Sequence, residues 1–357
     1  MWGEKPTSVR RASLFHDGTR IAAILTDKTL RIITLTTGEE VFTPLEDGWE
    51  VAVSRDGNLV ASVGSEALCL WKAETGEEIK RFQFDIVDTE SSHPLAFSPD
   101  GTCIGLGCKS DICIFNIDTG EVPSSPFKGH KEDVTSVAYS PDCTQIVSGS
   151  SDQTVRVWDA SNGSLIKMFD GHTYWNTVCF SPNGTQIAAG TIWGGIVQLW
   201  TVETGNSHKF ENHGRIFSLA FSQDGRFLIA GCYDDIYFWD LSTTQSNPKL
   251  VGYHVDAEVT SVAFFPDGKQ IMSTSTDGAI RVWDGQKLEK LYTKVYDVGG
   301  YWIFGEKSER LFWTFSDVRD PRNTLIYGPH VDLLHFVHGE EWIYCQKPLV
   351  LECKEAV

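Results

Sequence analysis

An internal repeat of about 42 residues constrains the fold of this chain more than any other feature of its sequence. Hairpin-turn signals recur at steps of roughly 39 to 44 residues, beginning at Asp17, Asp56, Asp100, Asp142, Asn183, Asp224 and Asp267, and one further step reaches Ser308. Most of these turns read Asp-Gly or Asn-Gly, because a tight hairpin turn needs residues that tolerate a positive φ. A fixed period of this length is typical of propellers and other repeat arrays.

Each repeat contains four runs of strand length. Residues 134–169 show the pattern best, with VTSVAYS, TQIVSGS, TVRVWDA and SLIKMF separated by the turns PDC, SDQ and NG. Alternation and β-branched residues favour strands, and no amphipathic window predicts a long helix. Four short strands per repeat predict an all-β propeller built from four-stranded antiparallel blades.

Two units carry a more specific signature. GHKEDVTSVAYSPDCTQIVSGSSDQTVRVWD, residues 129–159, and YHVDAEVTSVAFFPDGKQIMSTSTDGAIRVWD, residues 253–284, resemble the WD-repeat β-propeller family. The resemblance covers essentially the whole chain, although the first and last units match by turn spacing and strand pattern only. The C-terminal segments GYWIFGEKSERLFWTFSDVRDPRNTLIYG and LLHFVHGEEWIYC resemble fungal, especially mushroom, WD-repeat proteins of the vegetative-incompatibility or NACHT-receptor type.

Eight turn landmarks favour eight blades, with seven as the alternative. Seven blades would leave a long C-terminal segment unexplained, and residues 8–15 already form the expected first strand of the first unit. We therefore expect one propeller over residues 1–357, ending in a C-terminal tail at 346–357. The expected units are 8–47, 48–90, 91–130, 131–172, 173–213, 214–255, 256–298 and 299–345.

The resemblance implies a structural set of four side chains in the two best units. The family pairs a histidine, a serine or threonine, a turn aspartate and a tryptophan through hydrogen bonds. The matching residues here are His130, Ser148, Asp152 and Trp158, and His254, Ser273, Asp277 and Trp283. Histidine, aspartate and serine together also suggest a catalytic triad. Because the set recurs in two blades, the structural interpretation is favoured, and no catalytic residue is predicted.

Two other units depart from this pattern. Trp193 replaces the turn aspartate of the fifth unit, and Ala230 stands where the sixth needs a hydroxyl, so His172 and His213 lose part of their expected network. The nearby loops are candidates for partner binding, because tryptophan, tyrosine and arginine are enriched in interface hot spots. The candidate partner-binding residues are Tyr174, Trp175, Trp193, Arg215, Tyr233 and Asp235.

Composition excludes several classes of function. The net charge of −18 opposes phosphate backbones and anionic membranes, so neither nucleic acid nor membrane is an expected partner. The nine cysteines show no metal-binding spacing, and we expect neither a metal nor another cofactor. No signal peptide or membrane-spanning stretch is evident, which predicts a cytoplasmic protein.

The favoured function is a non-catalytic scaffold that binds a protein or peptide on the loop face of the propeller, as a monomer or within a larger complex. In view of the fungal resemblance, it would be a recognition module of a receptor-like system. The alternative is a carbohydrate-binding propeller, suggested by the 12 tryptophans. A propeller hydrolase is less favoured, because the glycosidase box S-x-D-x-G-x-x-W is missing.

Overall fold

The computed structural model of the chain describes most of the residues that precede the C-terminal segment. The described residues are 8–36, 40–41, 48–64, 67–83, 94–120, 127–171, 173–211, 214–242, 248–254, 257–285, 289–295, 304–306 and 309–311.

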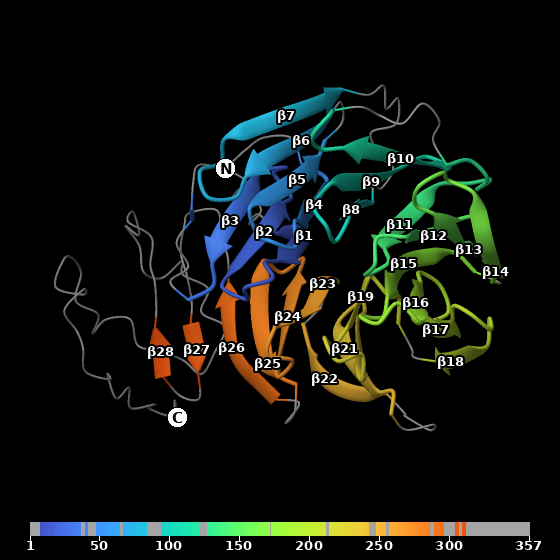
Figure 1. The fold of residues 1–357 in the computed structure, drawn as a ribbon. Coiled ribbons are helices and arrows are strands. Elements are labelled where there is room, and N and C mark those ends of the chain that lie inside the picture. Colours follow the sequence, from blue (N-terminus) through green and yellow to red (C-terminus); the bar gives the residue numbers. More distant parts are fainter. Residues whose placement is uncertain are drawn as a thin grey trace, which may run out of the picture.

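The described strands form seven antiparallel sheets arranged as blades around a common centre (Figure 1). Blade 1 contains β1 (Val9–Leu14), β2 (Arg20–Leu25) and β3 (Leu30–Thr34), and blade 2 contains β4 (Glu50–Val53), β5 (Leu59–Val63), β6 (Ala67–Lys72) and β7 (Glu78–Gln83). Blade 3 contains β8 (Leu95–Phe97), β9 (Cys103–Cys108) and β10 (Asp111–Asn116). Blade 4 contains β11 (Val134–Tyr139), β12 (Gln145–Ser150), β13 (Thr154–Asp159) and β14 (Leu165–Asp170).

The remaining blades follow the same order. Blade 5 contains β15 (Trp175–Phe180), β16 (Gln186–Thr191), β17 (Ile196–Thr201) and β18 (Ser207–Glu211), and blade 6 contains β19 (Ser218–Phe221), β20 (Phe227–Gly231), β21 (Asp235–Asp240) and β22 (Lys249–Tyr253). Blade 7 contains β23 (Val259–Phe264), β24 (Gln270–Ser275), β25 (Ala279–Asp284), β26 (Glu289–Val295), β27 (Phe304–Glu306) and β28 (Glu309–Leu311). In blades 1 and 3, single β-bridges from Glu40 and Phe127 occupy the outer edge.

The prediction of eight blades is wrong, because blade 7 closes directly on blade 1. The Ala12 amide in β1 donates to Ser261 Oγ in β23 at 3.0 Å, just as the Val178 amide in blade 5 donates to Ser136 Oγ of blade 4 at the same distance. Buried apolar side chains of blades 1 and 7, Ile21 and Met272 among them, also form one core cluster. Figure 1 shows β1 beside β23. The ring is therefore complete after seven sheets.

The expected eighth unit begins as an extension of blade 7. β27 pairs with the outer strand β26 through Phe304 and Lys294, and β28 pairs with β27. These two short strands therefore lengthen an existing sheet instead of starting a blade of their own. The other residues of the expected unit 299–345, and the expected tail 346–357, lie outside the described residues.

In blades 2 to 6, the recurring turn links the first and second strands by the same side-chain hydrogen bonds. In blade 4, Ser140 Oγ donates to Asp142 Oδ1 at 2.6 Å and accepts from the Gln145 amide at 2.9 Å. The same serine and acidic-residue contact recurs in blades 2, 3 and 6, and Asn183 takes the acidic position in blade 5. Gly57 in the blade 2 turn has a φ of 72°, in the left-handed region that favours glycine.

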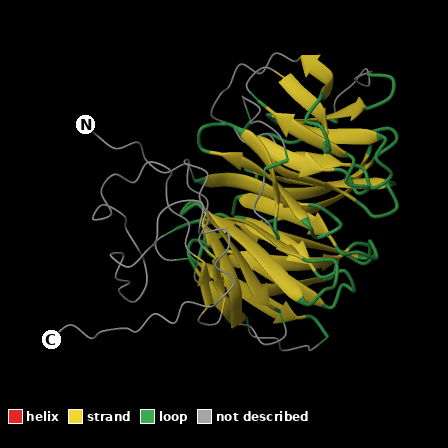
Figure 2. Cartoon of the chain, turned by 90° about the vertical axis from the view of Figure 1, so that its left-hand side faces the viewer, coloured by secondary structure: helices red, strands yellow, loops and turns green. Residues whose placement is uncertain are grey.

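Apolar packing between neighbouring blades holds the ring together. Between blades 4 and 5, for example, Val147 and Val157 share a buried cluster with Val178 and Ile187. Figure 2 shows strands joined by loops, with no helix in the part of the chain that is described. Burial of apolar surface stabilises each such boundary by about 25 cal/mol per Å². The ring is therefore a stiff platform for its loops.

The connections lie on two opposite faces. The loop that enters a first strand contacts the turn between the second and third strands of the same blade, as His130 contacts Asp152 in blade 4. We call the side that carries these two kinds of connection the loop face.

Candidate functional site

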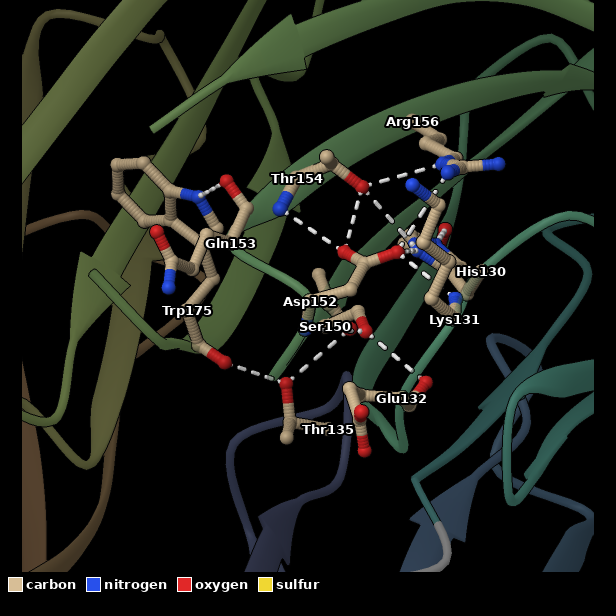
Figure 3. Close-up of polar contacts among 12 residues, drawn as sticks. His130, Lys131, Glu132, Thr135, Ser150, Asp152, Gln153, Thr154, Arg156 and Trp175 are labelled. Carbon is tan, nitrogen blue, oxygen red and sulfur yellow. Dashed lines mark hydrogen bonds and ion pairs between the residues drawn. The ribbon is translucent and has the colours of Figure 1, made fainter. Parts of the chain in front are cut away.

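The predicted set of four side chains in blade 4 is joined by hydrogen bonds. His130 lies on the loop before β11, and its Nδ1 is 2.9 Å from Asp152 Oδ2, while its Nε2 is 2.7 Å from Ser148 Oγ. Trp158 Nε1 donates to the same Ser148 oxygen at 2.8 Å. The contacts made by His130 and Asp152 are drawn in Figure 3. The simplest proton arrangement has Nδ1–H donating to the carboxylate and the serine hydroxyl donating to Nε2.

Electrostatics favour a neutral imidazole beside a charged carboxylate. Burial would raise the pKa of Asp152, but hydrogen bonds from Thr154, His130 and the Lys131 amide outweigh it and lower the pKa to about 2. Burial lowers the pKa of His130, although the bond to Asp152 opposes this. The geometry satisfies buried polar groups and stabilises the loop entering β11.

Blade 7 contains the second set, with looser contacts to its carboxylate. Ser273 Oγ lies 2.8 Å from His254 Nε2 and accepts from Trp283 Nε1 at 2.8 Å, but His254 Nδ1 is 3.4 Å from Asp277. Ala279 stands where blade 4 has Thr154, so the hydroxyl that donates to Asp152 is lost. Burial raises the pKa of Asp277 above its ordinary value, against the hydrogen bonds from Ser275 and the Ala279 amide.

The sequence analysis missed an arginine that accompanies these aspartates. Arg156 in β13 lies 3.5 Å from Asp152, and Arg281 in β25 lies 2.7 Å from Asp277. Blade 1 has neither histidine nor serine at the matching places, yet its Arg31 lies 3.8 Å from Asp27. Each arginine follows its aspartate by four residues, so the spacing D-x-x-x-R was visible in the sequence.

The network is incomplete in blade 6. Ala230 pairs with Tyr237 across β20 and β21, at the place where Ser148 pairs with Arg156 in blade 4. Without a serine hydroxyl, Trp239 Nε1 is buried and has no hydrogen-bond partner among the described residues. His213, and its blade 5 counterpart His172, lie outside the described residues.

Five of the six predicted partner-binding residues reach the surface of the loop face in blades 5 and 6. Tyr174, Trp193 and Tyr233 are 46%, 52% and 47% exposed. The exposed Arg215 places its guanidinium 4.2 Å from the centre of the Trp193 ring, a cation–π contact between the two blades. Asp235 is half-buried and accepts from the Tyr237 hydroxyl at 3.1 Å.

Trp175 is the exception, because its side chain points into the core. It is 1% exposed, packs edge-on against Trp200 at a ring separation of 5.3 Å, and donates from Nε1 to the Gln153 carbonyl at 3.1 Å. Successive side chains along an extended segment point to opposite sides, so the exposure of Tyr174 and the burial of Trp175 have the same cause. Trp175 is therefore not a contact for a partner.

A cavity of about 450 Å³ opens on the loop face of blade 6. It is lined by Gly214, Arg215, Cys232, Tyr233, Asp234 and Asp235. Burial raises the pKa of Asp235, the bond from Tyr237 lowers it, and the neighbouring charge of Asp234 raises it further. The cavity thus combines an exposed aromatic ring with two adjacent carboxylates.

A larger cavity of about 750 Å³ lies on the opposite face, between blades 6 and 7. Among its lining residues, Arg226 pairs with Asp240 at 3.0 Å, and Asp224 accepts from Ser222 Oγ at 2.6 Å. None of the predicted partner-binding residues lines this cavity.

Within the described ranges, no cluster of three or more histidine, cysteine, aspartate or glutamate side chains could hold a metal ion. The seven cysteines in these ranges are free thiols. No helix in the same residues has the length and apolar character needed to cross a bilayer.

Part of the chain matches a known protein family. The model described as "WD domain, G-beta repeat" matches residues 121–159, 163–201, 205–240 and 248–284, which correspond to blades 4 to 7. The predicted departures in blades 5 and 6 therefore lie within recognisable repeats.

The curated relatives are distant. A "Protein LST8 homolog" of Drosophila melanogaster is 28% identical over 66% of this chain and 77% of its own length. The "Small ribosomal subunit protein RACK1y" of Oryza sativa subsp. japonica is 34% identical over 49% of this chain and 52% of its own. A "Guanine nucleotide-binding protein subunit beta" of Zea mays is 26% identical over 67% of this chain and 53% of its own. The chain thus spans about half the length of the last two.

The resemblance of the C-terminal segment to fungal receptor proteins gains no support from these relatives, which come from a fly and two plants. Together, the repeats, the seven blades and the relatives show that the chain is a seven-bladed β-propeller whose blades 4 to 7 match the WD40 repeat, with distant similarity to LST8, RACK1 and G-protein β-subunits.

Proposed function

We propose that this propeller is a non-catalytic scaffold, and that it binds a protein or peptide through the loop face of blades 5 and 6. The contact residues would be Tyr174, Trp193, Arg215, Tyr233 and Asp235, which we call the blade 5–6 surface. The observation that carries this proposal is the exposure of three large aromatic side chains beside a cavity, on loops held by buried sheets.

The chemistry of this surface suits a macromolecular partner. Exposed aromatic rings supply contact area at little conformational cost, and an arginine stacked on one of them is already ordered before binding. One relative is named as a protein of the small ribosomal subunit, and another is named as a subunit of a guanine nucleotide-binding protein. We extend from them only the idea that this chain also acts as part of an assembly.

The structural sets in blades 4 and 7 fit this proposal as supports of the ring rather than as catalytic groups. An imidazole held between a carboxylate and a serine resembles a triad, but a nucleophile needs an approachable oxygen. Ser148 and Ser273 are both fully buried, and each of their oxygens already accepts from a tryptophan. The setting of the scaffold, including a fungal receptor system or the cytoplasm, stays a prediction.

The test is affinity capture with two variants that carry two alanine substitutions each. The surface variant, Trp193→Ala/Tyr233→Ala, removes two aromatic side chains of the blade 5–6 surface. The rim variant, Leu165→Ala/Met168→Ala, removes two similarly exposed apolar side chains from the outer strand of blade 4. We expect specific proteins to be captured by the wild type and the rim variant but not by the surface variant. Identical catches from all three would refute the proposal. Binding to a glycan array that depends on Trp193 would favour the carbohydrate alternative.

A further inference from the structure

Three blades neutralise the aspartate of the turn between the second and third strands with their own arginine. Asp27, Asp152 and Asp277 occupy this turn in blades 1, 4 and 7. In each case the arginine projects from the third strand. The residue that faces this arginine on the second strand is Ala23 for Arg31, Ser148 for Arg156 and Ser273 for Arg281.

Blade 6 keeps the acidic turn but replaces the arginine. Tyr237 takes its place opposite Ala230, and two carboxylates lie side by side, Asp234 in the turn and Asp235 at the start of β21. Among the described residues, neither carboxylate forms an ion pair, and the phenol of Tyr237 reaches only Asp235. The arginine that blades 1, 4 and 7 carry on the third strand is thus missing from blade 6, and the cation that lines its cavity, Arg215, is stacked on Trp193 instead of paired with either carboxylate.

A cavity that opens to solvent lies beside the two carboxylates. The two carboxylates line the cavity of about 450 Å³ together with the half-exposed ring of Tyr233. A planar cation in the cavity could contact both carboxylates through its N–H groups and stack on the ring. It would also relieve the repulsion between two adjacent negative charges, which contributes to the raised pKa of Asp235.

We propose that the blade 6 cavity binds an arginine side chain of the partner, whose guanidinium pairs with the carboxylates of blade 6 as Arg156 pairs with Asp152 in blade 4. The inference rests on the proposed function and specifies the chemistry of the partner at that surface. The overall charge of −18 would attract such a basic segment over distance and speed its association. Guanidinium suits the site better than ammonium, because its planar fork can serve two acceptors at once.

The first step of the test is selection of short random peptides on phage, with the wild-type chain as bait. Enriched sequences should contain arginine next to an aromatic or aliphatic residue. The best peptide is then synthesised in two forms, with arginine or with its neutral analogue citrulline, and its affinity is measured by fluorescence anisotropy.

The second step compares variants of the chain with that peptide. Asp234→Asn/Asp235→Asn removes the acceptors, and Tyr237→Arg supplies an internal guanidinium that should occupy the cavity. Each should weaken binding about tenfold or more, as should citrulline in the peptide. Tyr237→Phe should bind like the wild type. So should Glu74→Gln/Glu203→Gln, which changes the net charge equally at exposed sites away from the loop face.

The outcomes separate this inference from the proposed function. Peptides that depend on Trp193 and Tyr233 but not on the two aspartates would overturn the arginine site and keep the surface. Failure to enrich any peptide, or indifference to every variant, would overturn both. If Tyr237→Arg does not fold by circular dichroism, the asparagine variant and the citrulline peptide still decide the matter.

Discussion

Replacing Asp152 by alanine should destabilise the propeller strongly without any catalytic consequence. The side chain is 3% exposed and accepts four hydrogen bonds within 3.0 Å, from His130 Nδ1, the Lys131 amide, and the amide and hydroxyl of Thr154. Alanine leaves these donors without their acceptor, and each unsatisfied buried group costs about 1–3 kcal/mol. Because the Lys131 end of the loop can rehydrate, we expect a loss of about 3–5 kcal/mol in the free energy of unfolding.

The expected change in melting temperature follows from the size of the chain. Unfolding entropy is about 2.1 cal/mol/K per residue, so over 357 residues this loss corresponds to about 4–7 °C. The matched control is Asp142→Ala in the same blade. That carboxylate also accepts from one amide and two hydroxyls, but it is exposed, so water can replace it.

Differential scanning calorimetry of the two variants and the wild type decides the question. We expect the Asp142 variant to melt within about 1–2 °C of the wild type, since exposed substitutions usually cost little. If the Asp152 variant melts as high as the Asp142 variant, the carboxylate does not stabilise the entering loop and the structural interpretation is wrong.

Three further predictions concern Asp152 and two buried sites elsewhere in the ring. Since the pKa of Asp152 is lowered to about 2 from its ordinary value of 3.8, its stabilising effect is complete above about pH 4 and disappears as the pH falls through 2; the difference in the free energy of unfolding between wild type and Asp152→Asn, measured by urea titration, should shrink over that interval, and a constant difference would contradict this. Ala230→Ser should raise the free energy of unfolding by about 1 kcal/mol, measured in urea, by giving Trp239 Nε1 an acceptor like that of Trp158; an unchanged midpoint would mean that the hydroxyl does not reach it. Trp175→Ala should cost about 3–5 kcal/mol by calorimetry, since it empties a buried site, whereas a loss below about 1 kcal/mol would contradict its place in the core.

The sequence predicted the local architecture of the propeller well because local rules govern it. Acidic residue–glycine turns at a fixed period specify hairpins, and the runs between them have strand length and alternation. Ring size does not follow from such rules, since it depends on which two blades meet. That decision is made by contacts such as Ala12 with Ser261, which are separated by most of the chain. Counting turns therefore gave eight units, although the eighth turn signal lies next to short strands at the edge of blade 7.

The candidate surface shows the same division between local and long-range information. Alternation along the chain could have separated Tyr174 from Trp175, because only one of two consecutive side chains can face solvent when the other packs against Trp200. The stacking of Arg215 on Trp193 joins two blades and has no local signal. Asp234 was absent from the predicted set for another reason, since an exposed aspartate in a turn is ordinary until its missing arginine is noticed.

Repetition makes such a missing partner visible. In blades 1, 4 and 7, the aspartate of the turn pairs with an arginine of the same blade. In blade 6 a tyrosine stands at the position of that arginine and donates a hydrogen bond to Asp235. Burial nevertheless raises the pKa of Asp235, which has no arginine beside it to offset that effect. In a single-copy fold, this would be one more surface aspartate. In a propeller, three other blades show that an arginine can pair with the aspartate of this turn. The departure in blade 6 therefore leads to the specific expectation that the partner supplies an arginine.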